Sequence, residues 1–485
     1  MSFIPGQYSL DQILEIRKAF EANTAQGGIS PFVDGGSGAA LSMQSLDKTF
    51  VSLVSSDKDF RFLSQVPKRS VKQVIAEYNK NKSHGGGWYR SSHIGQSDEP
   101  RFRDVVLKRL FDEVCYVGEG FDYNKVVDTV DNVADPSLIQ GNGALRRAME
   151  NLTRASWFHK KANNPLTQDG ILEKCLAASS EFVIDARGQF PTADEMKHYS
   201  AEIRTQYFGL PNKAWMHNAT KALYDQIYDG NGKSWVFQNA NQNPGNVGMS
   251  NIIRGMYDSN AKDEYINFET DIFMDKHNWG VPMVLDEATG NYVEGPTSLT
   301  EAPAIPSVVL ANNGSTVGSL FSSSDAGSYK YRVSAGTNLD WSEASPEQAI
   351  AVAAGEAVEI TITPGSGGKP ATRFVVFRSI KPGSNTIRYM IELKRNPSGD
   401  TVHLDMNQDL PGTTIIVMGD FNSRSTVDES RTYVLTELLS FTKTLFPYGA
   451  GGKLRTKQGM VEFYGLVQYF APEKFRVWKN VPVRL

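Results

Sequence analysis

The sequence predicts an α+β protein that carries an inserted all-β sandwich. Two features indicate this class. A long amphipathic helix is expected over residues 135–161, between β-rich segments, and helical periodicity disappears between about 302 and 412. The chain has 485 residues, of which 40% are hydrophobic. This length is too great for one compact core, so two to four structural units are expected.

The first 60 residues are expected to form an arm rather than a domain. Ser9 and Gln12 have the spacing of a capping box for a short helix, and a glycine-rich stretch follows at 27–40. Such an arm suits contact with a neighbouring molecule, and a plain surface segment is equally compatible with the pattern.

Residues 61–134 are expected to be rich in strands, with a loop of about two dozen residues at 81–104 that exceeds common loop lengths. We interpret this loop as a two-stranded arm that reaches another subunit, with a mobile surface loop as the alternative. Acidic residues are interleaved with its arginines, which favours contacts between subunits over nucleic-acid binding. The candidate interface residues in the loop are Trp88, Tyr89, Arg90, Arg101 and Arg103.

The long helix is expected to begin at Asp135 and Pro136. An aspartate accepts hydrogen bonds from the free N–H groups of the first turn, and a proline at the first helical position loses no bond. Gly141 and Gly143 weaken the first turns, so the firm helix is expected over about 144–161.

An apolar stripe follows one side of this helix, because Leu138, Leu145 and Leu152 recur every seven residues. The stripe is expected to face the core. The other side carries three further candidate interface residues, expected to meet either a neighbouring subunit or packaged DNA: Arg146, Arg147 and Arg154.

Residues 165–298 are predicted to mix helices with strands. The expected elements are helices at 171–179, 192–208 and 219–230, the second capped by Thr192, and strands at 182–187 and 213–218. Short alternating strands separated by glycine- and proline-rich turns then indicate a β-sandwich of about 110 residues. These strands are expected at 304–311, 328–335, 357–364, 372–380, 386–395 and 401–406.

No catalytic, cofactor-binding or metal-binding residues are predicted, and the chain is not expected to be an enzyme. No histidine pair has the HExxH spacing, and the glycine loop before Lys453 lacks the first glycine and the hydroxyl residue of a phosphate loop. Cys115 and Cys175 predict buried thiols rather than a disulfide framework. The net charge of −4 gives no support to nucleic-acid binding by bulk electrostatics. No signal peptide or membrane-spanning segment is expected.

Three stretches in this order carry a family resemblance: VADPSLIQGNGALRRAMENLTRASWFH at 133–159, the predicted sandwich at 302–412, and APEKFRVWKNVPV at 471–483. Together they resemble the major capsid proteins of tailed bacteriophages with contractile tails. The Twort-like group, whose capsid protein carries an immunoglobulin-like insertion, is the most similar type. The sandwich also contains a tyrosine strand and a Trp-Ser turn that resemble fibronectin type III modules.

The resemblance implies the Hong Kong 97 capsid fold with an immunoglobulin- or fibronectin-like insertion. The implied parts are an N-arm (1–60), an E-loop hairpin with P-domain strands (61–134), the spine helix of the P-domain (135–164), the first part of the A-domain (165–301), the insertion (302–412), the A-domain return (413–460) and the C-terminal P-domain strands (461–485). Only one short capped helix precedes the strands, so no long scaffolding segment is expected. Some members cross-link a lysine to an asparagine; Lys82 lies near the loop, but no motif identifies its acceptor, so this chemistry is not assigned.

The implied function is self-assembly into hexamers and pentamers of an icosahedral phage head that encloses double-stranded DNA. The expected partners are further copies of the chain, a portal protein, possible decoration or scaffolding proteins, and DNA bound non-specifically, with no membrane. The expected location is the virion capsid, assembled in the host cytoplasm. Two alternatives remain open: a baseplate or fibre component with a carbohydrate-binding sandwich, and a polysaccharide-active enzyme with an accessory module.

Overall fold

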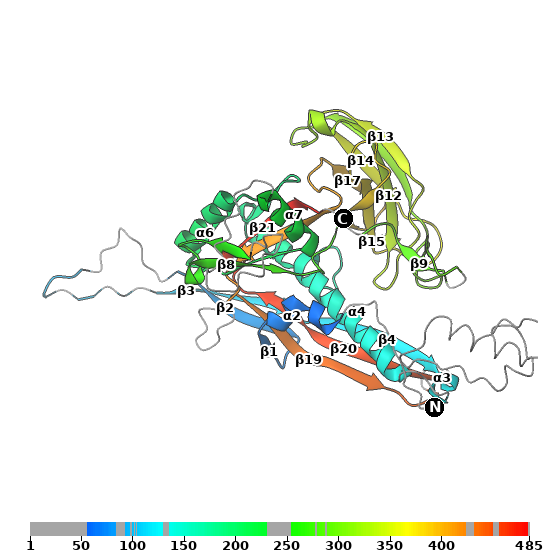
Figure 1. Cartoon of the computed structure of the whole chain (residues 1–485), viewed down its shortest axis with the longest axis horizontal. Coiled ribbons are helices and arrows are strands. Elements are labelled where there is room, and N and C mark those ends of the chain that lie inside the picture. The colour runs from blue at the N-terminus through cyan, green and yellow to red at the C-terminus, as the bar shows by residue number, and fades with distance from the viewer. Residues whose placement is uncertain are drawn as a thin grey trace, which may run out of the picture.

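The structure of the chain is a computed structural model. It describes residues 56–83, 93–97, 99–100, 102, 104–129, 135–229, 254–276, 279–286, 289–422, 431–449 and 455–483. These residues build a four-stranded sheet with a long helix on it, a six-stranded sheet with three helices, and a two-sheet β-sandwich (Figure 1). A two-stranded hairpin projects from the body on the side away from the sandwich. The α+β class that the sequence predicted is therefore present.

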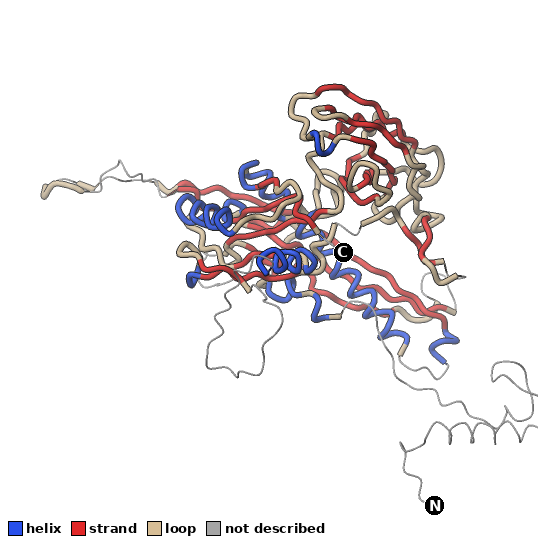
Figure 2. The backbone as a smooth tube through the Cα atoms, turned by 45° about the horizontal axis from the view of Figure 1, so that its top comes forward, coloured by secondary structure: helices blue, strands red, loops and turns tan. Residues whose placement is uncertain are grey.

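The four-stranded sheet has the order β1-β19-β20-β4. Its strands are β1 (Lys68–Ser70), β4 (Cys115–Asn124), β19 (Tyr433–Leu445) and β20 (Thr456–Tyr469). Strand β1 runs parallel to β19, and the other pairs are antiparallel. Helix α4 (Pro136–Phe158) runs along these strands and packs on β4 and β20 (Figure 2). The residues before the sheet also enter its core through α2 (Arg61–Gln65), because Phe62 packs on the Trp157 ring with centroids 4.2 Å apart.

Helix α4 begins at Pro136 as the sequence predicted, but its regular part starts earlier than the expected residue 144. The Asp135 carboxylate accepts from the Ser137 N–H at 2.8 Å, which confirms the predicted cap, and the helix is regular from Pro136 onward. Gly141 leaves room for the Lys443 ammonium, because a Cβ there would overlap the end of this flexible side chain and displace it. That ammonium donates to the Ser137 carbonyl at 2.6 Å and so supports the weak first turns. The helix ends at Phe158 rather than at residue 161, because its C-cap residue is extended.

The predicted apolar stripe is buried only in part. Leu152 is 1% exposed and Leu145 is half-buried, whereas Leu138 is 56% exposed. The first turn is contacted by the aliphatic stem of Lys443 instead of an apolar side chain, which leaves Leu138 outside the core. Further along the helix, Ala144 and Ala148 are fully buried, and their small side chains bring the helix close to the sheet.

The six-stranded sheet has the order β5-β21-β18-β6-β8-β7. Its strands are β5 (Val183–Asp185), β6 (Lys213–Met216), β7 (Gly255–Tyr257), β8 (Tyr265–Thr270), β18 (Thr413–Gly419) and β21 (Phe475–Pro482). Its helices are α5 (Ile171–Ala178), α6 (Ala193–Tyr207) and α7 (Asn218–Asp229). Thr192 caps α6 as predicted, since its hydroxyl accepts from the Glu195 N–H at 3.2 Å. The predicted helices and strands of residues 171–229 are present within a few residues of the expected bounds.

Strand pairing divides the C-terminal part of the chain differently from the sequence-based division. The division expected from the sequence grouped residues 413–460 with residues 165–301. It grouped residues 461–485 with the long helix at 135–164. In the structure, β18 and β21 pair with each other in the six-stranded sheet, whereas β19 and β20 pair in the four-stranded sheet. Each half of the C-terminal part therefore crosses between the two sheets and ties them together.

Seven strands of residues 307–405 form two facing antiparallel sheets. One has the order β11-β14-β17, and the other has the order β13-β12-β15-β16. The strands are β11 (Ser307–Ser315), β12 (Gly327–Gly336), β13 (Gln348–Val352), β14 (Glu356–Thr363), β15 (Arg373–Ser379), β16 (Ile387–Lys394) and β17 (Thr401–Asp405). Six of these match predicted strands, and β13 was missed. Tyr331, Val333, Ile360 and Phe374 are fully buried between the sheets.

A charged group lies inside this sandwich. Arg378 is 1% exposed, and its guanidinium contacts the Asp405 carboxylate at 2.6 Å and the Asn407 side-chain oxygen at 2.7 Å. The Tyr331 hydroxyl donates to the same carboxylate at 2.8 Å. Buried charges are tolerated only when paired and hydrogen-bonded, so this network fixes the positions of β12, β15 and β17 relative to one another.

The remaining strands and α-helix of the described residues are the hairpin strands β2 (Ile75–Ser83) and β3 (Val106–Glu113), helix α3 (Lys125–Thr129), and the small pair β9 (Met283–Leu285) and β10 (Tyr292–Glu294). The residues that lead to β9 pack against the outer side of the larger sandwich sheet, where Trp279 contacts Tyr389 with ring centroids 5.2 Å apart.

Candidate assembly surfaces

The hairpin β2–β3 is a separate two-stranded ribbon that pairs with no other sheet among the described residues. Its register places Ala76 opposite Asp112 and Glu77 opposite Phe111. Side chains alternate between the two faces of such a ribbon. One side, called here the outward face, carries Ile75, Glu77, Asn79 and Asn81 from β2 and Leu107, Arg109, Phe111 and Glu113 from β3.

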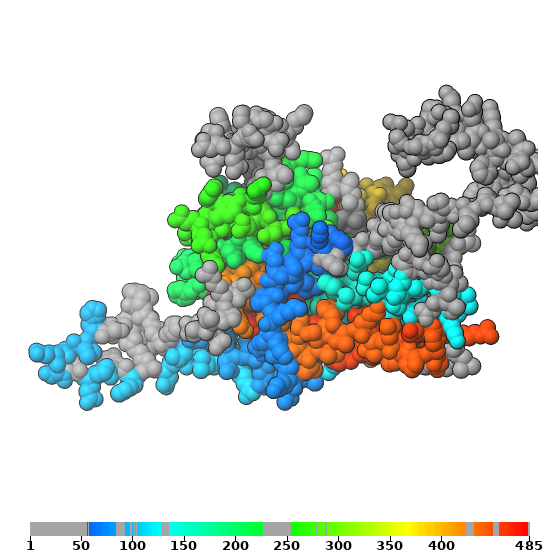
Figure 3. Space-filling model, turned by 60° about the horizontal axis from the view of Figure 1, so that its bottom comes forward, coloured from blue at the N-terminus to red at the C-terminus, as the bar shows by residue number. Residues whose placement is uncertain are grey.

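The outward face exposes large apolar side chains. Phe111 is 64% exposed, Leu107 is 66% exposed and Ile75 is 48% exposed. The charges beside them are compensated, because Arg109 and Glu77 form an ion pair across the ribbon. In the space-filling view the hairpin extends from one end of the body (Figure 3). Apolar side chains gathered on a projecting ribbon are typical of a surface that another molecule covers.

The opposite face of the ribbon fastens it to the body, mostly through polar contacts. Tyr78 packs on Phe470 with ring centroids 4.8 Å apart, and this burial raises the pKa of its hydroxyl. Lys80 forms an ion pair with Glu473. The Gln468 amide donates to the Ala76 carbonyl at 3.2 Å. These contacts set the direction in which the hairpin projects.

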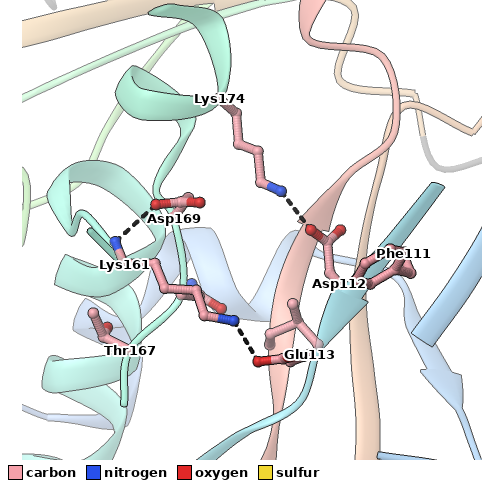
Figure 4. Close-up of a pocket in the computed structure, with 9 residues that line it drawn as sticks. Phe111, Asp112, Glu113, Lys161, Thr167, Asp169 and Lys174 are labelled. Atoms are coloured by element: carbon pink, nitrogen blue, oxygen red, sulfur yellow. Dashed lines mark hydrogen bonds and ion pairs between the residues drawn. The ribbon is translucent and has the colours of Figure 1, made fainter. Parts of the chain in front are cut away.

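Further ion pairs join the end of β3 to the segments around α5 (Figure 4). Asp112 pairs with Lys174, and the Glu113 carboxylate contacts the Lys161 ammonium at 2.5 Å. The hydrogen bond from Lys161 lowers the pKa of the Glu113 carboxyl, and the positive charge of Lys161 adds to this effect. The Asp169 carboxylate accepts from the Lys161 main-chain N–H at 2.7 Å. A cavity of about 260 Å³ lies among these groups.

The arginines that were predicted as interface residues on α4 contact acidic side chains of the same chain. Arg147 contacts the Glu119 carboxylate on β4 at 3.2 Å. Arg154 contacts Asp275 at 3.4 Å and Glu150 at 3.6 Å. These pairs hold the helix against the strand β4 and the segment after β8, so both arginines have a role inside the subunit.

Arg146 also has partners within the chain. It is half-buried, and it lies near enough to Asp59 to help lower the pKa of that carboxyl. The larger causes of that shift are the hydrogen bonds that Asp59 accepts from Ser56. The structure therefore brings the three helix arginines next to acids of their own subunit. A contact with a neighbour or with DNA stays a prediction for them.

The other predicted interface residues, Trp88, Tyr89, Arg90, Arg101 and Arg103, lie outside the residues that the structure describes. The hairpin that carries their loop is present. The sequence did not lead us to predict Phe111 and Leu107 as surface residues of the hairpin, or Gln168 as a residue that lines the cavity. The alternation in Val105–Glu113 could have placed Leu107, Arg109 and Phe111 on one face. Nothing in the sequence indicated that Gln168 would line a cavity.

Hydrogen bonds join the sandwich and its flanking residues to the six-stranded sheet. Arg187 donates to the Asn407 carbonyl at 2.6 Å and to the Leu320 carbonyl at 2.8 Å. Asn480 donates to the Asp185 carboxylate at 2.7 Å and to the Gln408 carbonyl at 2.8 Å. Because both sides of the junction are hydrogen-bonded, the sandwich is held in one orientation.

A lysine between aromatic rings forms a second contact at this junction. The Lys276 ammonium lies 4.8 Å from the centre of the Phe158 ring and 5.2 Å from that of Tyr389, in the range of cation–π attraction. Burial lowers the pKa of Lys276. Phe158 ends α4 and Tyr389 belongs to β16, so this lysine bridges helix α4 and the sandwich.

The described residues contain no group of three or more His, Cys, Asp or Glu side chains placed to hold a metal ion. Within the same residues, no helix is long and apolar enough to cross a membrane.

No family model matches this sequence, and no curated protein matches it. Solved structures that match this chain include the following three. A chain from "Capsid of native GTA particle computed with C5 symmetry" is 9% identical, with 92% of this chain and 97% of that chain covered and a TM-score of 0.43. The holo-SrpI encapsulin complex from Synechococcus elongatus PCC 7942 is 10% identical, with coverage of 93% and 97% and a TM-score of 0.40. The bacteriophage PhiM1 mature capsid is 9% identical, with coverage of 94% and 97% and a TM-score of 0.41.

Proposed function

We propose that this chain is the major capsid protein of a tailed bacteriophage, which self-assembles into the hexamers and pentamers of an icosahedral head around double-stranded DNA. The observation that carries the proposal is the projecting hairpin β2–β3. It is held to its own subunit on one side and exposes Phe111 and Leu107 on the other. A shell repeats the same contact between subunits many times. A projecting arm with exposed apolar side chains can form such a contact with each neighbouring subunit.

The parts of the subunit have distinct roles in this proposal. The hairpin is the E-loop, which lies over a neighbouring copy, and α4 with the four-stranded sheet is the P-domain that forms the rigid wall. The six-stranded sheet and its helices are the A-domain, which meets other copies around the capsomer centre. The sandwich is an immunoglobulin-like insertion on the outer surface. Its attachment through Arg187 and Asn480 keeps it in a fixed direction.

DNA contact in this proposal is non-specific and secondary. The net charge is −4, and Arg147 and Arg154 already face carboxylates of their own subunit. Affinity for DNA therefore adds little, and enclosure rather than recognition keeps the DNA inside. Portal, decoration or scaffolding proteins are further proposed partners, and the proposed location is the virion capsid after assembly in the host cytoplasm.

Expression of the full chain followed by electron microscopy tests the proposal. Closed shells are the expected product, and deletion of residues 85–103 at the hairpin tip is expected to abolish them while the circular dichroism of the unassembled protein stays unchanged. Small closed oligomers that bind glycans would contradict the proposal and favour a baseplate or fibre protein. Shells that form from the deletion variant would show that the hairpin is not an arm between subunits.

A further inference from the structure

The cavity beside the base of the hairpin adjoins the outward face. It lies between the end of β3, the connection from α4 to α5, and strand β20, and its volume is about 260 Å³ (Figure 4). Phe111 and Glu113 line it, and both belong to the outward face. Phe111 is 64% exposed, and the Glu113 side chain is 55% exposed. A side chain of another molecule that lies on the outward face can therefore enter the cavity.

The cavity carries one more carboxylate than ammonium groups. The ionisable groups that line it are the carboxylates of Asp112, Glu113 and Asp169 and the ammonium groups of Lys161 and Lys174. Asp112 pairs with Lys174, and Glu113 pairs with Lys161. Asp169 forms no ion pair with any residue that the structure describes. Because both lysines are already paired, one negative charge is left over in the cavity.

The carboxylate of Asp169 is half-buried and is held in place by the main chain. One of its oxygens accepts from the Lys161 N–H at 2.7 Å. Figure 4 shows the other oxygen turned toward the space between the Lys161 and Lys174 side chains. A partly buried carboxylate attracts a cation more strongly than one in open solvent, because the surrounding dielectric constant is lower. The position of Asp169 therefore favours a positively charged ligand.

The other groups of the cavity favour a guanidinium over a metal ion. A guanidinium is planar, donates two hydrogen bonds to a carboxylate and stacks on an aromatic ring such as that of Phe111. Its single charge equals the charge that is left over. A divalent metal ion needs several oxygen ligands, and within the described part of the chain no three acidic, histidine or cysteine side chains are placed to hold one.

We propose that this cavity receives an arginine side chain of a second copy of this chain. The guanidinium donates to the Asp169 carboxylate and stacks on the Phe111 ring. The arginine comes from a second copy, because the cavity adjoins the surface that is proposed to meet another subunit. This inference rests on the proposed function, since it assigns a specific contact within the assembly.

The variant Asp169→Asn tests the charge. Asparagine keeps an oxygen that accepts from the Lys161 N–H but carries no charge. The concentration needed for assembly is expected to rise roughly 3- to 10-fold, and the difference from the wild type should shrink in 1 M salt. The matched control is Asp400→Asn, an exposed position on the sandwich that should assemble like the wild type. Assembly of Asp169→Asn at the unchanged concentration would overturn the inference.

Site-specific photo-crosslinking in the full chain identifies the partner residue. A photoreactive benzoylphenylalanine replaces Leu166, which is 63% exposed and directly precedes the lining residue Thr167. Irradiation of the assembled protein is expected to give covalent dimers in which the linked peptide of the second copy contains an arginine. The control replaces Leu339, which is 75% exposed on the sandwich, and is expected to yield far fewer dimers.

Replacement of the linked arginine by methionine completes the test. Combined with Asp169→Asn, this change is expected to raise the assembly concentration no further, because both changes remove the same contact. Additive effects, or a linked peptide without arginine, would overturn the inference. Particles without dimers from position 166 would also overturn it and leave the proposed function intact. If circular dichroism shows that Asp169→Asn is unfolded, the crosslinking decides. A wild-type chain that forms no oligomer at all would overturn both the inference and the proposed function.

Discussion

The hairpin β2–β3 and the sandwich strands β12 and β15 are antiparallel pairs built for different environments. In the sandwich, Val333 and Phe374 are fully buried against the facing sheet. On the hairpin, the outward face leaves Phe111 and Leu107 about two-thirds exposed, at 64% and 66%. The sandwich therefore buries its apolar side chains within one chain. In the proposed function, a second copy covers this face of the hairpin.

The two regions also differ in how they are fixed to the rest of the subunit. The sandwich combines a buried charge network with hydrogen bonds from Arg187 and Asn480. The base of the hairpin depends on the ion pairs of Lys80 and Lys174 and on one aromatic contact. Changes in the sandwich should therefore act on folding, and changes on the hairpin should act on assembly.

The largest loss of folding stability is expected from Arg378→Met. This change leaves the Asp405 carboxylate, which is 3% exposed, without its cation. Breaking a buried ion pair from one side costs about 3–5 kcal/mol. Hydrogen exchange is expected to accelerate throughout β12, β15 and β17 while the hairpin amides are unchanged. Arg388→Met on the neighbouring strand is the control, since Arg388 donates only to a main-chain carbonyl. Equal exchange in both variants would contradict the central role of Arg378.

The carboxyl of Asp271, in the core beneath α4, is expected to make folding stability depend on pH. Burial raises the pKa of Asp271 to about 6 from 3.8, against the opposing effect of the hydrogen bonds from Phe273 and Trp157. The folded state thus binds this proton more tightly than the unfolded state. The contribution of this group to stability is fully present below about pH 3.8 and is lost as the pH rises through about 6.

Asp271→Asn should remove this dependence. The free energy of unfolding of the variant minus that of the wild type is expected to rise by about 3 kcal/mol between pH 4 and pH 7. Denaturant titrations across this range measure it. The exposed change Asp400→Asn is the control for an aspartate-to-asparagine substitution outside the core. The same difference at all pH values for Asp271→Asn would contradict the raised pKa of the buried carboxyl.

An effect on assembly alone is expected from Leu107→Asp. Burial of a leucine side chain at a subunit contact contributes about 1.5–3 kcal/mol, so the concentration needed for assembly should rise at least tenfold. The thermal unfolding of the unassembled protein should stay the same, because Leu107 is exposed there. Leu339→Asp is the matched control, since Leu339 is 75% exposed on the sandwich. Equal assembly of both variants would remove the distinction between the two regions.

The smallest effect is expected from Lys174→Met at the base of the hairpin. The pair with Asp112 is partly exposed, so its loss should weaken the attachment of the hairpin by about 1 kcal/mol. Limited proteolysis near residues 106–113 should become faster, and the difference from the wild type should shrink in 1 M salt. Lys161→Met should have a smaller effect, because its pair with Glu113 is more exposed. The reverse order would show that the outer pair fixes the hairpin.

Much of the fold could be predicted from local patterns. The Asp135–Pro136 start, the Thr192 cap and the alternation of β14 depend on neighbouring residues, and each is present in the structure. The regularity of the first turns of α4 could not be predicted, because Lys443, whose ammonium donates to the Ser137 carbonyl, is distant in the sequence. Strand β13 was missed because QAIAV is short and weakly alternating.

The candidate site could be predicted only in outline. The long loop indicated an arm, and the hairpin that carries this loop is present. The arginines of α4 were expected to face other molecules, but Arg147 and Arg154 are paired with acids of their own subunit. The pairs with Glu119 and Asp275 are not visible in the sequence, because only the fold brings these acids to the helix, whereas Glu150 and Arg154 have the i,i+4 spacing of a helical ion pair.

Hydrogen–deuterium exchange of the same chain before and after assembly tests the central claim most directly. The claim is that a second copy covers the hairpin, whereas the sandwich is complete within one subunit. Amides of residues 75–83 and 106–113 are predicted to exchange roughly tenfold more slowly in the assembled protein, with the sandwich core of β12, β14 and β15 unchanged. Unchanged exchange in the hairpin, together with new protection in the sandwich, would contradict the claim.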